Sequence, residues 1–152
     1  MSARRRVCRP LALALGIVAL TACGSTTHAV TPSVSGSATA TRGPVHAVAS
    51  PVKVALLSPK NDEVITASTV HVAVSLSGGT ITPEYSTHVS PTVGHLHLYM
   101  NGELVSMNYS TDTDLLVDRG TEYSLYVEWV ASDHGSFTPR DVTPKIFFAV
   151  SP

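Results

Sequence analysis

The sequence predicts an antiparallel β-sandwich of about seven strands over residues 51–152. From Pro51 onward, apolar and polar residues alternate with a period of two, which is typical of strands that bury one face. Gly, Pro, Asn and Asp residues separate these runs at short intervals, as turns between strands require. No window shows the periodicity of an amphipathic helix. A segment of this length can build one hydrophobic core and is too small for two.

The alternation also assigns side chains to the two faces of each strand. In the run from residue 95 to 100, Leu96, Leu98 and Met100 are expected in the core. Asn101–Gly102 predicts a type I′ hairpin, because that turn needs positive φ at both central residues. Trp129 is expected in the core by the same parity. The expected strands are 52–57, 69–77, 95–100, 103–107, 113–120, 121–132 and 142–150, with a turn at 58–64.

The N-terminus carries the pattern of an export signal. Four arginines precede the apolar run at 11–20, which is too short to span the ~30 Å of a bilayer core. The run ends in "LTAC" at 20–23, which resembles the lipobox of bacterial lipoproteins. The resemblance implies a signal peptide over residues 1–22 and acylation of Cys23, so that the chain is anchored on the extracytoplasmic face of the cell membrane through this lipid.

Processing at this point would change the composition of the chain. The sequence has 2 cysteines, and removal of residues 1–22 with acylation of Cys23 leaves no free thiol, which excludes disulfides and thiolate metal sites. Loss of four signal arginines leaves six basic against eleven acidic residues, a net charge of −5. An acidic chain of this kind is not expected to bind nucleic acid.

Residues 23–50 are expected to form a tether between the lipid and the domain. The tract consists largely of Ser, Thr, Ala, Gly, Pro and Val and shows no apolar periodicity. Such a composition buries too little surface to offset its ordering entropy, which predicts disorder. His28 and His46 lie in this tract and are expected to be incidental. The predicted domain therefore begins at residue 51.

The stretch "LLVDRGTEYSLYV" at 115–127 resembles the start of strand F in fibronectin type III and immunoglobulin-like domains. In those domains a leucine, a turn glycine and a tyrosine precede alternating apolar residues. The resemblance implies that Tyr123 is the corner tyrosine, whose hydroxyl bonds back to the chain. It also implies that Leu125 and Val127 are core positions. The fold class implied is an immunoglobulin-like or fibronectin III-like sandwich, which does not by itself give a function.

Two histidines stand one residue apart in "VGHLHLYMNGE" at 93–103. If the aliphatic residues of this strand are buried, His95 and His97 face solvent on its other side, where two imidazoles can share a metal ion. The strand from Thr121 is expected to pair beside them in antiparallel fashion. Its following loop would then bring His134 closer to His95 than to His97. These three histidines are candidate ligands for Cu(II) or Zn(II), and His88, Asp133 and Glu128 are further candidates.

The same region resembles a group of small exported bacterial domains with a G-H-x-H strand, a hairpin and a later Asp-His pair. The group has no firmly assigned activity. The positions that match are Gly94, His95, His97, Gly102, Gly120, Asp133 and His134. Met100 is expected in the core, and Met107 has no spacing that marks it as a ligand.

The sequence favours a binding or accessory module over an enzyme. It contains no nucleophile elbow, no phosphate-binding glycine loop and no HExxH motif. Its carboxylates are scattered through turns rather than paired. Three readings of the histidines stay open: a metal site, a ligand-binding or pH-sensing role, or a solvated strand face on a structural or protein-binding domain without metal.

Overall fold

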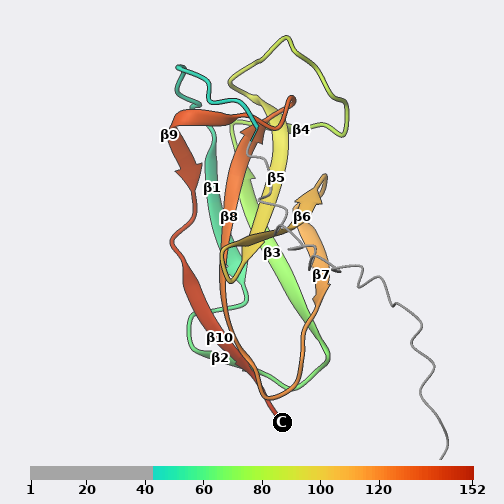
Figure 1. The fold of residues 1–152 in the computed structure, drawn as a ribbon. Coiled ribbons are helices and arrows are strands. Elements are labelled where there is room, and N and C mark those ends of the chain that lie inside the picture. The colour runs from blue at the N-terminus through green and yellow to red at the C-terminus, as the bar shows by residue number, and fades with distance from the viewer. Residues whose placement is uncertain (1–42) are drawn as a thin grey trace, which may run out of the picture. The chain divides into compact units, whose positions relative to one another are not determined.

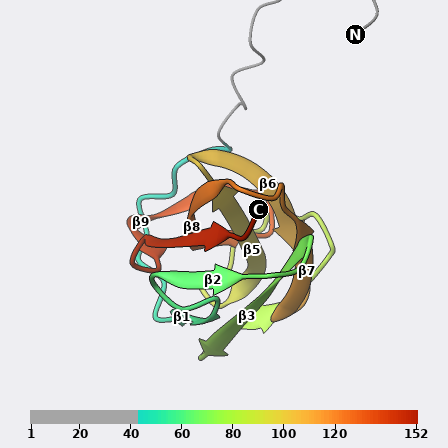
Figure 2. The same cartoon turned by 90° about the horizontal axis from the view of Figure 1, so that it is seen from below.

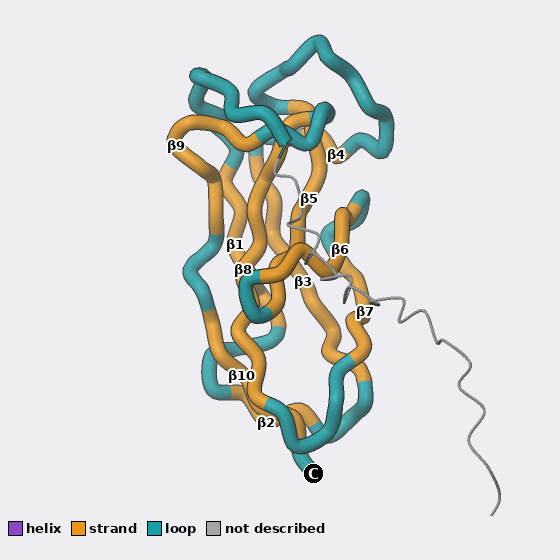
Figure 3. Tube along the Cα trace, in the orientation of Figure 1, coloured by secondary structure: helices purple, strands orange, loops and turns teal. Residues whose placement is uncertain are grey.

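A computed structural model describes residues 43–152, and these residues form strands and loops without a helix (Figure 3). The predicted signal peptide, Cys23 and most of the predicted tether lie outside the described residues. Within the described range, no helix is long and apolar enough to cross a membrane. The strands are β1 (Lys53–Ser58), β2 (Glu63–Ile65), β3 (Thr69–Ser77), β4 (Thr80–Ile81), β5 (Val93–Met100), β6 (Glu103–Asn108), β7 (Asp112–Leu116), β8 (Glu122–Ala131), β9 (Ser136–Val142) and β10 (Ile146–Val150).

The strands form two sheets that face each other (Figures 1 and 2). One sheet has the order β1-β3-β7, and the other has the order β2-β10-β8-β5-β4, with β6 paired to β5 and β9 paired to β8. The long strands pair in antiparallel fashion, whereas the short strands β2 and β4 pair in parallel with β10 and β5. The all-β sandwich predicted from the sequence is confirmed.

The described residues contain three short strands more than the sequence predicts. β2 and β4 have 3 and 2 residues, which is too short for an alternating pattern to show. β9 contains Pro139, and its burial does not alternate. It pairs only with β8, at the edge of the sheet where a proline is tolerated.

The core lies between the sheets and follows the predicted parity. Leu96, Leu98 and Trp129 are fully buried in it, and Met100 joins them. These side chains meet the valines of β3 from the opposite sheet. Because side chains alternate along a strand, burial of these residues assigns the residues between them to the outer face of the second sheet.

Two predicted local features are present at the ends of β5 and β8. Asn101 has φ 54° and Gly102 has φ 87°, which are the positive values of a type I′ turn between β5 and β6. The hydroxyl oxygen of Tyr123 accepts the backbone N–H of Asp118 at 2.9 Å, which is the bond expected of a corner tyrosine. The Tyr123 ring stacks on Phe148 at 5.4 Å between centroids.

Candidate metal centre

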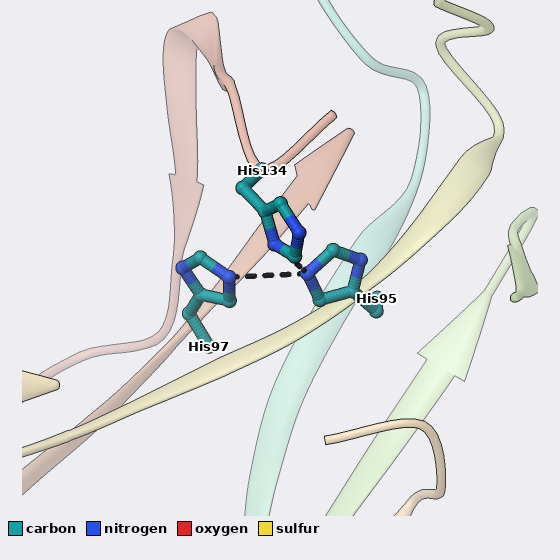
Figure 4. A group of neighbouring side chains, drawn as sticks. All are labelled: His95, His97 and His134. Carbon is teal, nitrogen blue, oxygen red and sulfur yellow. Dashed lines mark hydrogen bonds between the residues drawn. The ribbon is translucent and has the colours of Figure 1, made fainter. Parts of the chain in front are cut away.

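Three histidine rings converge on the outer face of the second sheet. His95 and His97 come from β5, and His134 comes from the turn between β8 and β9 (Figure 4). The Nε2 atom of His95 lies 3.1 Å from Nε2 of His97 and 2.9 Å from Nδ1 of His134. One ring nitrogen from each histidine lies within 4.8 Å of those of the other two. His134 is nearer to His95 than to His97, with centroid distances of 4.7 and 5.7 Å, as the antiparallel pairing predicts.

These spacings are those of nitrogen atoms that share a metal ion. Two ligands held at about 2.0–2.1 Å from one ion, at angles of 90–110°, lie roughly 2.9–3.4 Å apart. The two short nitrogen distances at His95 fall within this interval. A donor set of three imidazoles suits Zn(II) and copper, and the ring positions therefore fit such an ion.

Hydrogen bonding among the three rings makes one nitrogen of His95 serve two neighbours. A neutral imidazole nitrogen offers either one N–H or one lone pair, both in the plane of the ring. Nε2 of His95 meets a nitrogen of each of the other two rings. It can therefore make one well-directed hydrogen bond and leaves the other contact poorly satisfied. Buried polar groups in folded proteins normally have partners, and a shared cation would satisfy all three lone pairs.

The rings are buried, so the expectation that His95 and His97 face solvent is wrong. Their exposed fractions are 1% and 5%. The parity of β5 was predicted correctly, but other segments cover this outer face. The Tyr109 ring lies 5.1 Å from that of His95, and the Tyr85 ring lies 6.1 Å from that of His134. Alternation gives the face of a side chain and cannot show what covers that face.

The turn that presents His134 is held by several close contacts. His134 has φ 66°, a value that is uncommon outside glycine and that surrounding structure must maintain. Its N–H donates to the carbonyl of Ala131 at 2.9 Å. The Oδ1 atom of Asp133 accepts the N–H of Gly135 at 3.0 Å. Asp133 therefore shapes the turn, and the group of three ring nitrogens does not include it.

The segment before β1 also supports this turn, which corrects two expectations from the sequence. The tether was predicted to extend to residue 50, but Val45 forms a bridge with Ser136 on β9. His46, expected to be incidental, places Nε2 2.9 Å from Oδ1 of Asp133. A Cβ on Gly43 would lie 2.3 Å from the carbonyl oxygen of His134, so the chain passes very close to the turn. The segment 43–46 therefore packs against the residues that position His134.

Glu128, a candidate further ligand, is engaged elsewhere. It lies beside His97 in the register of β5 and β8, but its side chain is fully buried rather than exposed. Its Oε1 atom accepts from Nε of Arg140 at 2.7 Å and from the hydroxyl of Ser136 at 2.8 Å. A second nitrogen of Arg140 contacts Oε2. The charge of the carboxylate is thus neutralised by Arg140, and Glu128 is not part of the group of ring nitrogens that could hold an ion.

The remaining histidines of the domain lie apart from the centre. His88 is exposed, and its backbone N–H donates to the hydroxyl of Ser86. His71 on β3 is exposed and places Nδ1 2.9 Å from Oδ1 of Asp114. Neither belongs to the group of ring nitrogens that could hold one ion.

The surroundings keep two of the rings neutral. Burial, together with the neighbouring His97 and His134, lowers the pKa of His95 from its ordinary 6.5 to about 4. Burial and His134 likewise lower the pKa of His97 to about 4, against an opposing effect of Glu128. Burial alone would raise the pKa of the Glu128 carboxyl, but hydrogen bonds from Arg140 and Ser136 outweigh it and hold the pKa below its ordinary value. Neutral imidazoles are the forms that ligate metal.

The low pKa values predict that acid destabilises the metal-free protein. In the unfolded chain His95 and His97 take up protons near pH 6.5, whereas in the folded chain they do so near pH 4. Between these values the unfolded state binds more protons, so the free energy of unfolding falls as pH falls. From pH 7 to 5 we expect each ring to contribute a loss on the order of 2 kcal/mol. Urea denaturation at pH 7, 6 and 5 measures this change.

A matched pair of variants assigns that pH dependence to the centre. His97→Gln should reduce the slope, because one of the two shifted groups is gone. His88→Gln changes an exposed histidine outside the centre and controls for the loss of one histidine side chain. A free energy of unfolding that stays constant from pH 7 to 5 would contradict the prediction.

Several residues of the centre carry no signal in the sequence. Tyr85 lies in the loop before β5 and Tyr109 directly follows β6, and neither position carries a pattern that marks it as a cover for the rings. Arg140 reaches Glu128 from β9, a strand that the sequence does not reveal. Only the Asp-His pair at 133–134 and the His-x-His spacing pointed to this region.

Comparisons with known proteins bear on the fold alone. No family model matches the chain. No curated protein sequence matches it either. Among solved structures, the fibronectin(III)-like modules of Clostridium thermocellum CbhA align with 64% of this chain and 94% of their own, at 18% identity and a TM-score of 0.48. The strand order and the tyrosine corner described above make this chain an all-β sandwich of the fibronectin III-like and immunoglobulin-like class.

Proposed function

We propose that this protein is a lipid-anchored, extracytoplasmic metal-binding module that holds one Cu(II) or Zn(II) ion on His95, His97 and His134. The observation that carries the proposal is the convergence of three ring nitrogens, those of the buried His95 and His97 and of the partly buried His134, two pairs of which lie 2.9 and 3.1 Å apart. These spacings suit ligands of one ion and do not suit a complete hydrogen-bond network.

The surroundings of the rings support binding rather than catalysis. His95 and His97 are almost fully buried, and Tyr109 lies against the His95 ring. A substrate would have little access to an ion held under these side chains. The rigid positions on β5 and in the pinned turn would also hold the ligands in place before the ion arrives, which favours affinity.

The anchoring part of the proposal rests on the sequence. The "LTAC" motif places an acylated cysteine at position 23, and the tract before residue 43 would then separate the domain from the membrane. Acylation is tested by mass spectrometry of the protein extracted from bacterial membranes. A mature protein that retains residues 1–22, or carries an unmodified Cys23, would refute the anchor without touching the metal site.

Metal binding is tested on a tag-free protein of residues 24–152, which omits both cysteines. Isothermal titration of the chelator-treated protein with Cu(II) and Zn(II) should show one ion bound per chain. In His95→Ala/His97→Ala the affinity should fall by at least about 100-fold, because loss of direct ligands should cost no less than loss of their outer partners. His71→Ala/His88→Ala removes two histidines outside the centre and should bind as the wild type does.

A second measurement covers the case in which the double variant does not fold. Thermal unfolding of the wild type should shift upward when either ion is added, because an ion that binds the native state alone stabilises it. His134→Ala changes a turn residue rather than a strand residue and should lose this shift. Equal, weak binding by the wild type and both variants would instead favour the alternative function, a structural or protein-binding domain without metal.

A further inference from the structure

The sheet register places a thioether beside the candidate metal centre. Met107 on β6 is the direct antiparallel partner of His97 on β5. Paired residues on neighbouring antiparallel strands project from the same face, with Cβ atoms about 4.5–5.5 Å apart. The irregularity in this pairing falls between Leu98 and Tyr99, so it does not disturb the position of Met107. Met107 and His97 therefore share the outer face of the sheet.

The neighbouring residues on β6 and beyond agree with this assignment. Tyr109, two positions after Met107, lies against the ring of His95. Met107 lies beside His97 and Tyr109 lies beside His95, which is the reversed order that an antiparallel pair requires. Met107 is 48% exposed, in contrast to Met100, which is 8% exposed and packs in the core. A half-exposed methionine beside buried imidazoles is not needed to fill the core.

The chemistry of the side chain indicates which ion would use it. Methionine has three rotatable bonds and a polarisable sulfur, so Sδ can turn toward the ring nitrogens without a change in the backbone. Thioether sulfur is a soft ligand that favours Cu(I) and adds little to the binding of Zn(II). The acidic carboxylate nearest to His97, on Glu128, is already occupied by Arg140.

We propose that Met107 is a fourth ligand of the centre and makes it a site for Cu(I), with three imidazole nitrogens and one thioether sulfur. This inference rests on the proposed metal-binding function; it assigns copper rather than zinc, and the Cu(I) rather than the Cu(II) state. The three histidines alone would suit Zn(II) and copper alike, whereas a thioether ligand from Met107 would favour Cu(I) over Zn(II). The site would bind the ion as cargo or store, with no electron transfer required.

The test compares two methionine variants in the protein of residues 24–152. Cu(I) affinity is measured without oxygen, in the presence of a mild reductant, by competition with a chromophoric Cu(I) chelator. Zn(II) affinity is measured by competition with a Zn(II) indicator. Met107→Leu should weaken Cu(I) binding by about 10-fold or more and leave Zn(II) binding within about 2-fold of the wild type. Met100→Leu, a core substitution of similar volume, should leave both affinities unchanged.

X-ray absorption of the Cu(I)-loaded protein gives a direct readout of the ligand. A sulfur atom in the first coordination shell should be present in the wild type and in Met100→Leu, and absent in Met107→Leu. Equal Cu(I) affinities and no sulfur ligand in the wild type would overturn the role of Met107 while leaving the histidine site intact. A wild type that binds Zn(II) but not Cu(I) would also overturn it. Binding of neither ion, together with no binding of Cu(II) in the titration described above, would remove the proposed function itself.

Discussion

Replacement of Arg140 with alanine is expected to destabilise the domain by about 3–5 kcal/mol at pH 7. The side chain of Glu128 is fully buried, and two nitrogens of Arg140 compensate its negative charge. In Arg140→Ala the carboxylate would lose both guanidinium nitrogens and keep the neutral hydroxyl of Ser136 as a donor. An uncompensated buried charge costs more than the ion pair itself contributes, which is why loss of one partner has a large effect. Chemical denaturation followed by the fluorescence of Trp129 measures the change.

Two comparisons make this result specific. Adding Glu128→Gln to Arg140→Ala removes the buried charge and should recover part of the lost stability. Arg119→Ala is the matched control, because Arg119 is exposed and donates only to a carbonyl at the C-terminus, 3.4 Å away. Its free energy of unfolding should stay within about 0.5 kcal/mol of the wild type. Arg140→Ala with wild-type stability would show that Glu128 does not need this partner.

Replacement of Gly94 with alanine is expected to cost at least about 3 kcal/mol, or to prevent folding. A Cβ at this position would lie 1.9 Å from the carbonyl oxygen of Val130 and 3.2 Å from the Trp129 ring. The carbonyl belongs to β8, the strand that pairs directly with β5, so it cannot move without separating the two strands that carry the centre. Thermal unfolding and the soluble yield of Gly94→Ala measure the effect.

Gly102→Ala separates this steric effect from the conformational freedom of glycine. Gly102 has φ 87°, and a Cβ there would meet no atom within 4 Å. The cost of this variant is therefore only the strain of a positive φ, about 1 kcal/mol. If the two variants unfold at the same temperature, the close approach at Gly94 is not the reason for its glycine.

Gly94→Ala and Arg140→Ala should also affect the candidate metal centre, to different degrees. Gly94 precedes His95, so any displacement of β5 moves a proposed ligand. Arg140 does not contact the rings directly, but it binds Glu128, the β8 residue that pairs with His97. Its loss would leave the negative charge of Glu128 unpaired without moving β5. Gly94→Ala that still folds should therefore bind metal more weakly than Arg140→Ala does.

Several positions of the G-H-x-H and Asp-His pattern in residues 94–134 have a structural role. Gly94 is required by the approach of Val130, and Gly102 and Gly120 adopt positive φ in turns. Asp133 shapes the turn that carries His134. These residues fix the backbone of β5 and of the turns around it. That backbone in turn holds the three imidazoles close together.

Much of the fold follows from the sequence because strand periodicity is a local property. The uninterrupted alternation at 69–77 predicts β3 with its observed bounds, and Asn101–Gly102 predicts the hairpin after β5. Short or proline-containing strands gave no such pattern, which is why β2, β4 and β9 were not predicted. The pairing of β5 with β8 was predicted, and this pairing alone brings His134 toward His95.

The sequence by itself determined which side chains of β5 enter the core and which histidines could meet, because alternation and antiparallel pairing follow from backbone geometry. Only the tertiary structure decided that these histidines are buried, that Arg140 neutralises Glu128, and that His46 and Met107 lie beside the centre. Each of these depends on how neighbouring strands, loops and the segment before β1 pack over one outer face of a sheet. Burial and charge are properties of that assembled surface, whereas periodicity is a property of the strand alone.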